Sequence, residues 1–216
     1  MSVPVRLLGN SHGNMTPIRL GARLGLRMIH LGDLGFRASW LKAPRIPNLH
    51  VVAGNHDDIV TARETSIYLG DFGDLGEHVP GLEDVFFLRG ANSIDRDLRV
   101  EGRDWWAEEE LSDEELEEAI ALYSRLGPRL VLSHECALVV GHMLLGADLI
   151  PSRTATALWR MLQLHEPECW YFGDHHVSWE RMVGNTRFRG LAIDEVLDVD
   201  LRCFSWSERN MPCIRP

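Results

Sequence analysis

The chain has 216 residues, of which 45% are hydrophobic and 25% charged, and its formal net charge is -10 at pH 7. This composition is typical of a globular protein, and the length suits a single domain. No apolar run approaches the roughly 20 residues that a membrane helix needs, so we expect no membrane protein. The acidic balance argues against sequence-independent nucleic-acid binding, which depends on Lys and Arg side chains against phosphates.

The chain carries no signs of secretion. Its N-terminus leads directly into a strand-like segment, and its four cysteines show no CxxC spacing. We therefore expect a cytoplasmic protein with reduced thiols. A single domain is predicted over residues 1–206, followed by a loosely held tail over 207–216, where periodicity ends. The sequence does not indicate the oligomeric state.

The first third of the chain alternates between strand-like and helical patterns. Thr16 and Pro17 suit the start of a helix, as N-cap and first helical residue. Strands separated by helices imply a parallel sheet with right-handed crossovers, and hence an α/β fold. Strands are expected over 4–9, 27–32 and 49–53, and helices over 16–27 and from Asp57 to about Tyr68.

The later elements are marked by helix caps and turn residues. Ser112 and Glu115 have the spacing of a capping box, which predicts a helix over 113–126. Two segments are predicted to be loops, the Gly- and Pro-rich stretch 69–82 and the pair Gly141-His142. A further helix is expected over 153–164, and strands over 84–89, 180–183, 187–192 and 196–202.

Five short apolar runs end in the same way, with Gly or Ser followed by Asn, Asp or His. Because the carboxyl ends of parallel strands meet at one edge of a sheet, we expect these polar side chains to gather there. Imidazoles, carboxylates and amide carbonyls are ligands of first-row divalent metals. The polar endings are Gly9-Asn10-Ser11-His12, Gly32-Asp33, Gly54-Asn55-His56-Asp57, Ser133-His134 and Gly173-Asp174-His175-His176.

The order of these endings resembles the calcineurin-like metallophosphoesterases, whose motifs run Asp-x-His, Gly-Asp, Gly-Asn-His-Asp/Glu, His and Gly-His-x-His. The likeness covers about residues 5–177. Two further stretches, Gly90–Asp95 and Trp105-Trp106, resemble stretches of the small stand-alone bacterial and phage members of the family. The resemblance implies an α/β sandwich of two mixed β-sheets flanked by helices. It also implies hydrolysis of phosphate monoesters or diesters by a metal-activated water, without a covalent intermediate.

The resemblance further implies a dinuclear metal site. Mn2+ is the expected ion, with Mg2+, Fe2+, Zn2+ and Ni2+ as alternatives. Asp33 would bridge the two ions, and His56 would act as general acid or stabilise the transition state. The first ion would be held by Asn10, His12, Asp33 and His176, and the second by Asp33, Asn55, His134 and Asp174.

Two of these positions depart from the family pattern. Asn10 stands where the family has Asp, and Asp174 stands where it has His. The two exchanges leave the total charge of the ligands unchanged but move one negative charge from the first ion to the second. Binding of the first ion should therefore be weakened most. A second hypothesis follows: a degenerate or silenced member that binds metal poorly and acts by binding a phosphorylated partner.

Other residues limit the class of substrate that we expect. The residues that follow Asp33 lack the Asp and Arg of the family's protein phosphatases, which argues against a protein Ser/Thr phosphatase. Arg96, Arg99 and His175 are candidate substrate-binding residues, although a solvated loop explains the two arginines equally well. The expected partner is a phosphate ester, with nucleic acid expected only as a substrate. Cys136 has no basic partner in the sequence, so a thiol nucleophile is not expected.

Overall fold

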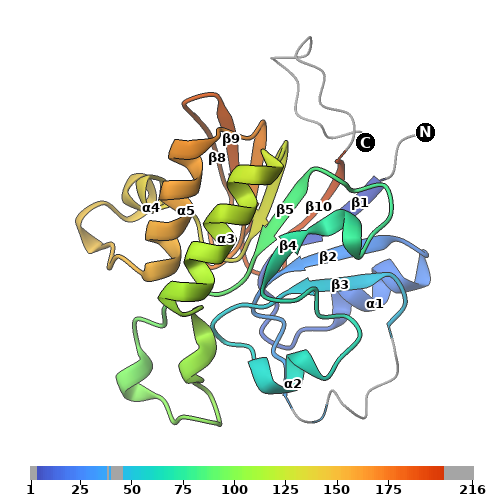
Figure 1. Ribbon diagram of the computed structural model, residues 1–216. Helices are drawn as coiled ribbons and strands as arrows, with labels where there is room; N and C mark the ends of the chain where they lie inside the picture. The colour runs from blue at the N-terminus through green and yellow to red at the C-terminus, as the bar shows by residue number, and fades with distance from the viewer. Residues whose placement is uncertain (1–3, 38, 40–45, 202–216) are drawn as a thin grey trace.

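The computed structural model describes residues 4–37, 39 and 46–201. Two mixed β-sheets pack against each other, and helices cover their outer faces (Figure 1). The first sheet has the strand order β10-β1-β2-β3, and the second has the order β4-β5-β6-β7-β9-β8. The predicted sandwich of two mixed sheets flanked by helices is confirmed. The predicted tail 207–216 and the last residues of the predicted domain, 202–206, lie outside the described residues.

The polar endings follow parallel strands in both sheets. Within the first sheet β1, β2 and β3 run parallel, and within the second β5, β6, β7 and β9 do. The strands are β1 (Pro4–Leu8), β2 (Arg27–Leu31), β3 (Leu49–Val52), β4 (Phe72–Asp74), β5 (Val85–Leu88), β6 (Leu130–Ser133), β7 (Cys169–Phe172), β8 (Trp179–Val183), β9 (Thr186–Gly190) and β10 (Val196–Asp200). The helices are α1 (Thr16–Arg23), α2 (Ile59–Arg63), α3 (Asp113–Leu126), α4 (Leu138–Leu145) and α5 (Arg153–Leu164).

Successive side chains of the buried strands point to opposite faces of the sheets, and the hydrophobic core therefore has three layers. In β5, Val85 and Phe87 belong to the layer between the two sheets, whereas Phe86 and Leu88 belong to the layer under the helices of the second sheet. Helices α3, α4 and α5 cover that outer face, and α1 and α2 cover the first sheet. Because both faces of the second sheet are covered, its strands β5 and β7 are apolar throughout. No helix within the described residues is both long and apolar enough to cross a membrane.

Helix α3 has the predicted bounds, and its capping box is confirmed: the Ser112 side chain accepts from the Glu115 backbone, and the Glu115 side chain accepts from the Ser112 backbone. The helix predicted over 57–68 is wrong in its extent. It begins after Asp58, whose side chain accepts from the Thr61 N–H, and ends at Arg63. The following residues pair instead with the edge of β3, where the Val51 N–H donates to the Ile67 carbonyl.

Two predicted loops contain regular structure. The stretch 69–82 includes β4, which pairs antiparallel with β5 and completes the edge of the second sheet. Gly141-His142 lies inside α4. This helix is apolar along most of its length and therefore lacks the amphipathic period by which helices are predicted.

Candidate active site

The loops that follow β1, β2, β3, β6 and β7 meet at one edge of the sandwich. Glycine precedes the polar residues in most of these loops because the chains approach too closely for a side chain. A Cβ on Gly54 would lie 2.2 Å from Asp33 Oδ1 and 2.6 Å from His134 Nε2. A Cβ on Gly32 would lie 2.0 Å from His134 Nδ1. The predicted convergence of the polar endings is therefore seen at the level of single atoms.

Asp33 lies at the centre of this polar cluster, and its two carboxylate oxygens face different groups. Asp33 Oδ2 accepts a hydrogen bond from Asn10 Nδ2 at 3.0 Å and lies 3.8 Å from His12 Nε2. Asp33 Oδ1 accepts from the His56 backbone N–H at 3.0 Å and lies 3.4 Å from His134 Nε2. Its side chain is 1% exposed, so these neighbours replace solvent almost entirely.

Several cluster residues have a strained backbone. His12, Asp33, Asp174 and His176 have φ angles of 44°, 56°, 54° and 58°, in the left-handed region that non-glycine residues rarely adopt. Such conformations cost of order 1–3 kcal/mol each and persist where the surrounding structure over-determines them. Their concentration at this edge is typical of a functional site.

On the outer side of Asp33, His12 and His176 form an exposed pair. Their Nε2 atoms lie 3.1 Å apart, and their rings meet edge to face with centroids 5.1 Å apart. Burial lowers the pKa of both imidazoles. His134 adds to the shift of the His12 pKa, and His12 adds to the shift of the His176 pKa. Both are therefore neutral at pH 7, which is the form that binds metal. With Asp33, these two residues offer one set of metal ligands.

On the inner side, three oxygen atoms approach one nitrogen of His134. The Nδ1–H of His134 donates to the Leu31 carbonyl at 2.7 Å. Its Nε2 lies 3.0 Å from Asn55 Oδ1, 3.4 Å from Asp33 Oδ1 and 3.5 Å from Asp174 Oδ1. If His134 were neutral, its Nε2 would be a hydrogen-bond acceptor that faces three other acceptors. This arrangement requires either a proton on Nε2 or a cation between these atoms.

The charges of this inner group are strongly coupled. Burial raises the pKa of Asp33 to about 7 against the opposing effect of His134. Burial also raises the pKa of Asp174 to about 6, and Glu135 adds to that shift. Burial acts to lower the pKa of His134, but Asp33 and Asp174 outweigh it, so the net shift is upward. A buried cation bound among these carboxylates would replace the imidazolium proton.

The two asparagines of the cluster are oriented differently. The Asp174 backbone N–H donates to Asn10 Oδ1 at 3.1 Å, which leaves the Asn10 amide nitrogen facing Asp33. An NH2 group cannot ligate a metal, so Asn10 does not fit the ligand role as it is oriented. Asn55 has the opposite arrangement: its amide nitrogen donates to Ser93 Oγ at 3.0 Å, and its oxygen faces His134.

His56 lies at the rim of the cluster beside Arg99. The Arg99 guanidinium contacts both ring nitrogens of His56, with Nη2 3.1 Å from Nε2, and pairs with Asp95 at 2.7 Å. Burial lowers the pKa of His56 to about 3, and Arg99 contributes to the shift. Arg96, the other predicted phosphate ligand, has an exposed side chain that pairs with Asp97 at 3.9 Å.

His175 lies beneath the cluster in a second group of polar side chains. Its Nε2 lies 2.9 Å from Glu135 Oε1 and 3.2 Å from Cys136 Sγ. Burial alone would lower the pKa of His175, but the contact with Glu135 outweighs it, and the pKa is raised to about 9. Cys136 thus has a basic neighbour that the sequence did not reveal. Burial nevertheless raises the pKa of its thiol well above the ordinary value, so the predicted absence of a thiol nucleophile fits this environment.

Sequence reasoning missed the positioning role of Asp57. Its buried carboxylate accepts hydrogen bonds from the backbone N–H groups of Leu34, Gly35, Phe36 and Gly54. It thereby fixes the loop after β2 against the loop after β3, and Asp33 with them. Its place directly after Asn55-His56 was the available signal.

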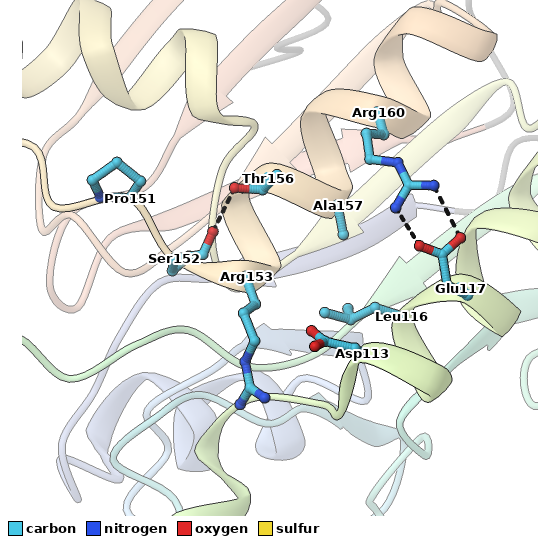
Figure 2. A pocket seen from close by; sticks show the side chains of 9 residues that line it. All are labelled: Asp113, Leu116, Glu117, Pro151, Ser152, Arg153, Thr156, Ala157 and Arg160. Carbon is cyan, nitrogen blue, oxygen red and sulfur yellow. Dashed lines mark hydrogen bonds and ion pairs between the residues drawn. The ribbon is translucent and has the colours of Figure 1, made fainter.

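A separate surface pocket lies between α3 and α5 (Figure 2). Leu116 and Ala157 form its apolar wall, and the ion pair between Arg160 and Glu117 lies along one side. None of the nine residues that line it belongs to the polar cluster.

Comparison with models of known protein families gives no match, and comparison with curated protein sequences gives none either. Among solved structures, the chain is similar to a candidate 5'-nucleotidase from Staphylococcus aureus in complex with alpha-ketoglutarate. The two are 12% identical with a TM-score of 0.51, over 92% of this chain and 50% of that chain. This chain therefore spans about half the length of that protein.

Two further structures resemble the chain. One is a conserved uncharacterized protein from Streptococcus pneumoniae described as a predicted phosphoesterase, 14% identical over 89% of this chain and 74% of that chain, with a TM-score of 0.41. The other is a phosphopantetheinyl hydrolase from Mycobacterium tuberculosis, 15% identical over 90% of this chain and 92% of that chain, with a TM-score of 0.47. The chain has the fold of the calcineurin-like metallophosphoesterases, as its motif order predicted. At these identities the likeness concerns the fold alone.

Proposed function

We propose that this protein is a metal-dependent phosphoesterase that hydrolyses phosphate monoesters or diesters with a water activated by divalent cations. One observation carries the proposal: the two oxygens of the buried Asp33 face two separate sets of metal donors. A dinuclear phosphoesterase requires a carboxylate that joins two cations in this way. The phosphoesterase-type fold supports the proposal at the level of architecture.

The inner and outer donor sets differ in how well they suit a cation. The inner set combines two carboxylates, an imidazole and a correctly oriented amide oxygen. The outer set has two neutral imidazoles and one carboxylate, with an amide nitrogen beside them. Oxygen and imidazole donors make Mn2+ the first choice, with Mg2+, Fe2+, Zn2+ and Ni2+ as alternatives. The inner ion would be held by Asp33, Asn55, His134 and Asp174, and the outer ion by Asp33, His12 and His176.

When bound, the ions would supply Lewis-acid charge and lower the pKa of a coordinated water. Arg99 would bind the substrate phosphate through its guanidinium, whose paired N–H donors match phosphate oxygens. The incoming phosphate would replace His56 as the partner of Arg99. Its negative charge would favour the protonated form of His56, which could then donate a proton to the leaving oxygen.

A second candidate function is favoured by the orientation of Asn10. Its amide nitrogen satisfies Asp33 Oδ2 without a cation. A chain with a weakened outer site could bind a phosphorylated partner through Arg99 and the inner ion without turning it over.

Hydrolysis assays distinguish the two candidates. We would measure Mn2+-dependent hydrolysis of p-nitrophenyl phosphate and bis(p-nitrophenyl) phosphate by the natural chain and by Asn10→Asp. Asn48→Asp makes the same chemical change at an exposed turn and is the matched control. Turnover by the natural chain, lost on chelation, supports the enzyme. Turnover by Asn10→Asp alone supports the binding function for the natural chain.

A further inference from the structure

A second group of potential metal ligands lies beside the proposed catalytic centre. Two pairs of adjacent residues contribute to it: Glu135 and Cys136 follow β6, and Asp174 and His175 follow β7. Because β6 and β7 are neighbouring parallel strands, the two loops lie together. The ligand atoms of Glu135, Cys136 and His175 all lie within 4.8 Å of one another.

One ring nitrogen of His175 lies close to three other potential ligand atoms. His175 Nε2 lies 2.9 Å from Glu135 Oε1, 3.2 Å from Cys136 Sγ and 3.7 Å from Asp174 Oδ2. Donors at the usual bond lengths of about 2.0–2.3 Å from zinc lie roughly 3.3–3.8 Å apart, which fits the Asp174 distance. The Glu135 and Cys136 atoms lie slightly closer to His175 than this, so a zinc ion between them would require a small outward shift. The ring N–H of His175 makes one good hydrogen bond, to Glu135, so it does not account for the approach of the second carboxylate, Asp174, to the same nitrogen.

We propose that Glu135, Cys136 and His175 bind a zinc ion, with Asp174 as the fourth ligand. A thiolate and an imidazole together favour zinc over Mn2+ or Mg2+. The site is mostly buried, since Cys136 is 0% and Glu135 6% exposed and the side chains of His175 and Asp174 are 8% and 19% exposed, which suits a structural rather than a catalytic zinc ion. Binding releases the thiol proton of Cys136 and the proton that His175 shares with Glu135.

The surrounding contacts suit such a site. The Cys136 backbone N–H donates to Glu135 Oε1 at 2.8 Å, and Ser152 Oγ lies 3.5 Å from Glu135 Oε2. These contacts orient the carboxylate in the way that metal ligands are usually supported. Asp174 Oδ1 faces His134 while its Oδ2 faces His175, so the zinc would hold this carboxylate in place for the neighbouring centre.

Cobalt substitution tests the proposal without an activity assay. The full chain carrying Cys203→Ser and Cys213→Ser leaves Cys136 and Cys169 as the thiols. We expect its Co2+ form to show a thiolate-to-cobalt absorption in the near ultraviolet and its zinc form to hold one thiolate-bound ion per chain. Cys136→Ser should abolish the absorption. Cys169→Ser, which changes the other buried thiol, should retain it.

Two results would overturn the zinc site: no thiolate absorption in cobalt-loaded protein, or an absorption that survives Cys136→Ser. Should Cys136→Ser fail to fold, X-ray absorption at the zinc edge needs no variant at that position. One sulfur at about 2.3 Å is expected, and nitrogen and oxygen neighbours alone would contradict the proposal. Asp33→Asn removes the proposed catalytic bridge but should retain the cobalt–thiolate absorption, so this proposal and the proposed function fail separately.

Discussion

Asp57→Asn removes charge from the side chain that joins two site loops, with almost no change in volume. Asp57 Oδ1 accepts from Gly35 at 2.7 Å and from Phe36 at 3.0 Å. Asp57 Oδ2 accepts from Gly54 at 2.9 Å and from Leu34 at 3.3 Å. An Asn in this position keeps one acceptor oxygen, and its NH2 group then faces two backbone N–H donors.

The cost follows from the number of donors left without an acceptor. A hydrogen bond to a charged group contributes about 1.5–3 kcal/mol, and a buried donor left unsatisfied costs a similar amount. Losing two such bonds should reduce the free energy of unfolding by about 3–6 kcal/mol. With a urea m-value of about 2 kcal/mol per molar, the unfolding midpoint should fall by roughly 1.5–3 M.

Urea unfolding followed by circular dichroism measures this loss, and the neighbouring Asp58→Asn is the matched control. Asp58 caps α2 by accepting from the Thr61 N–H at 3.1 Å. Asn caps helices about as well as Asp, so the control should change stability by less than about 0.5 kcal/mol. If Asp57→Asn costs no more stability than Asp58→Asn, the Asp57 carboxylate does not hold the two site loops together.

Two further substitutions test the electrostatics of the chain. Burial alone would raise the pKa of Asp71, but Arg89 and the Tyr68 hydroxyl outweigh it and hold that pKa below its usual range. The stability from this pair is present above the ordinary aspartate pKa of about 3.9 and is lost as pH falls through the lower folded value. Asp71→Asn should therefore destabilise the protein at pH 7 and show a smaller further loss on acidification, measured by thermal unfolding between pH 7 and pH 2. Equal acid sensitivity in the two proteins would contradict this. Arg99→Gln should raise the KM for a phosphate ester about 10- to 100-fold, whereas the exposed Arg96→Gln should leave it within about two-fold. Equal effects of the two substitutions would remove Arg99 from the proposed phosphate site.

The sequence predicted where the site lies because strand endings are a local pattern. Asp33 and His134 each follow a short apolar run, and parallel strands bring their carboxyl ends together whatever the details of the connections. Helix α3 was predictable for the same reason, since Ser112, Glu115 and its apolar stripe are all local signals.

What the sequence did not predict depends on contacts between distant segments. The orientation of Asn10 is set by the backbone N–H of Asp174, 164 residues away. The contact between Cys136 and His175 could not be predicted without knowing that β6 and β7 are neighbouring strands. Helix α4 was missed because its residues are apolar on nearly all sides, and β4 because only three residues form it.

The most direct test of a metal site centred on Asp33 is a Mn2+ titration of the natural chain and of Asp33→Asn by isothermal calorimetry. We predict saturable Mn2+ binding to the natural chain, with a tighter and a weaker component from the inner and outer donor sets, and loss of both in Asp33→Asn. Absence of Mn2+ binding to the folded natural chain, or equal binding to both proteins, would contradict it.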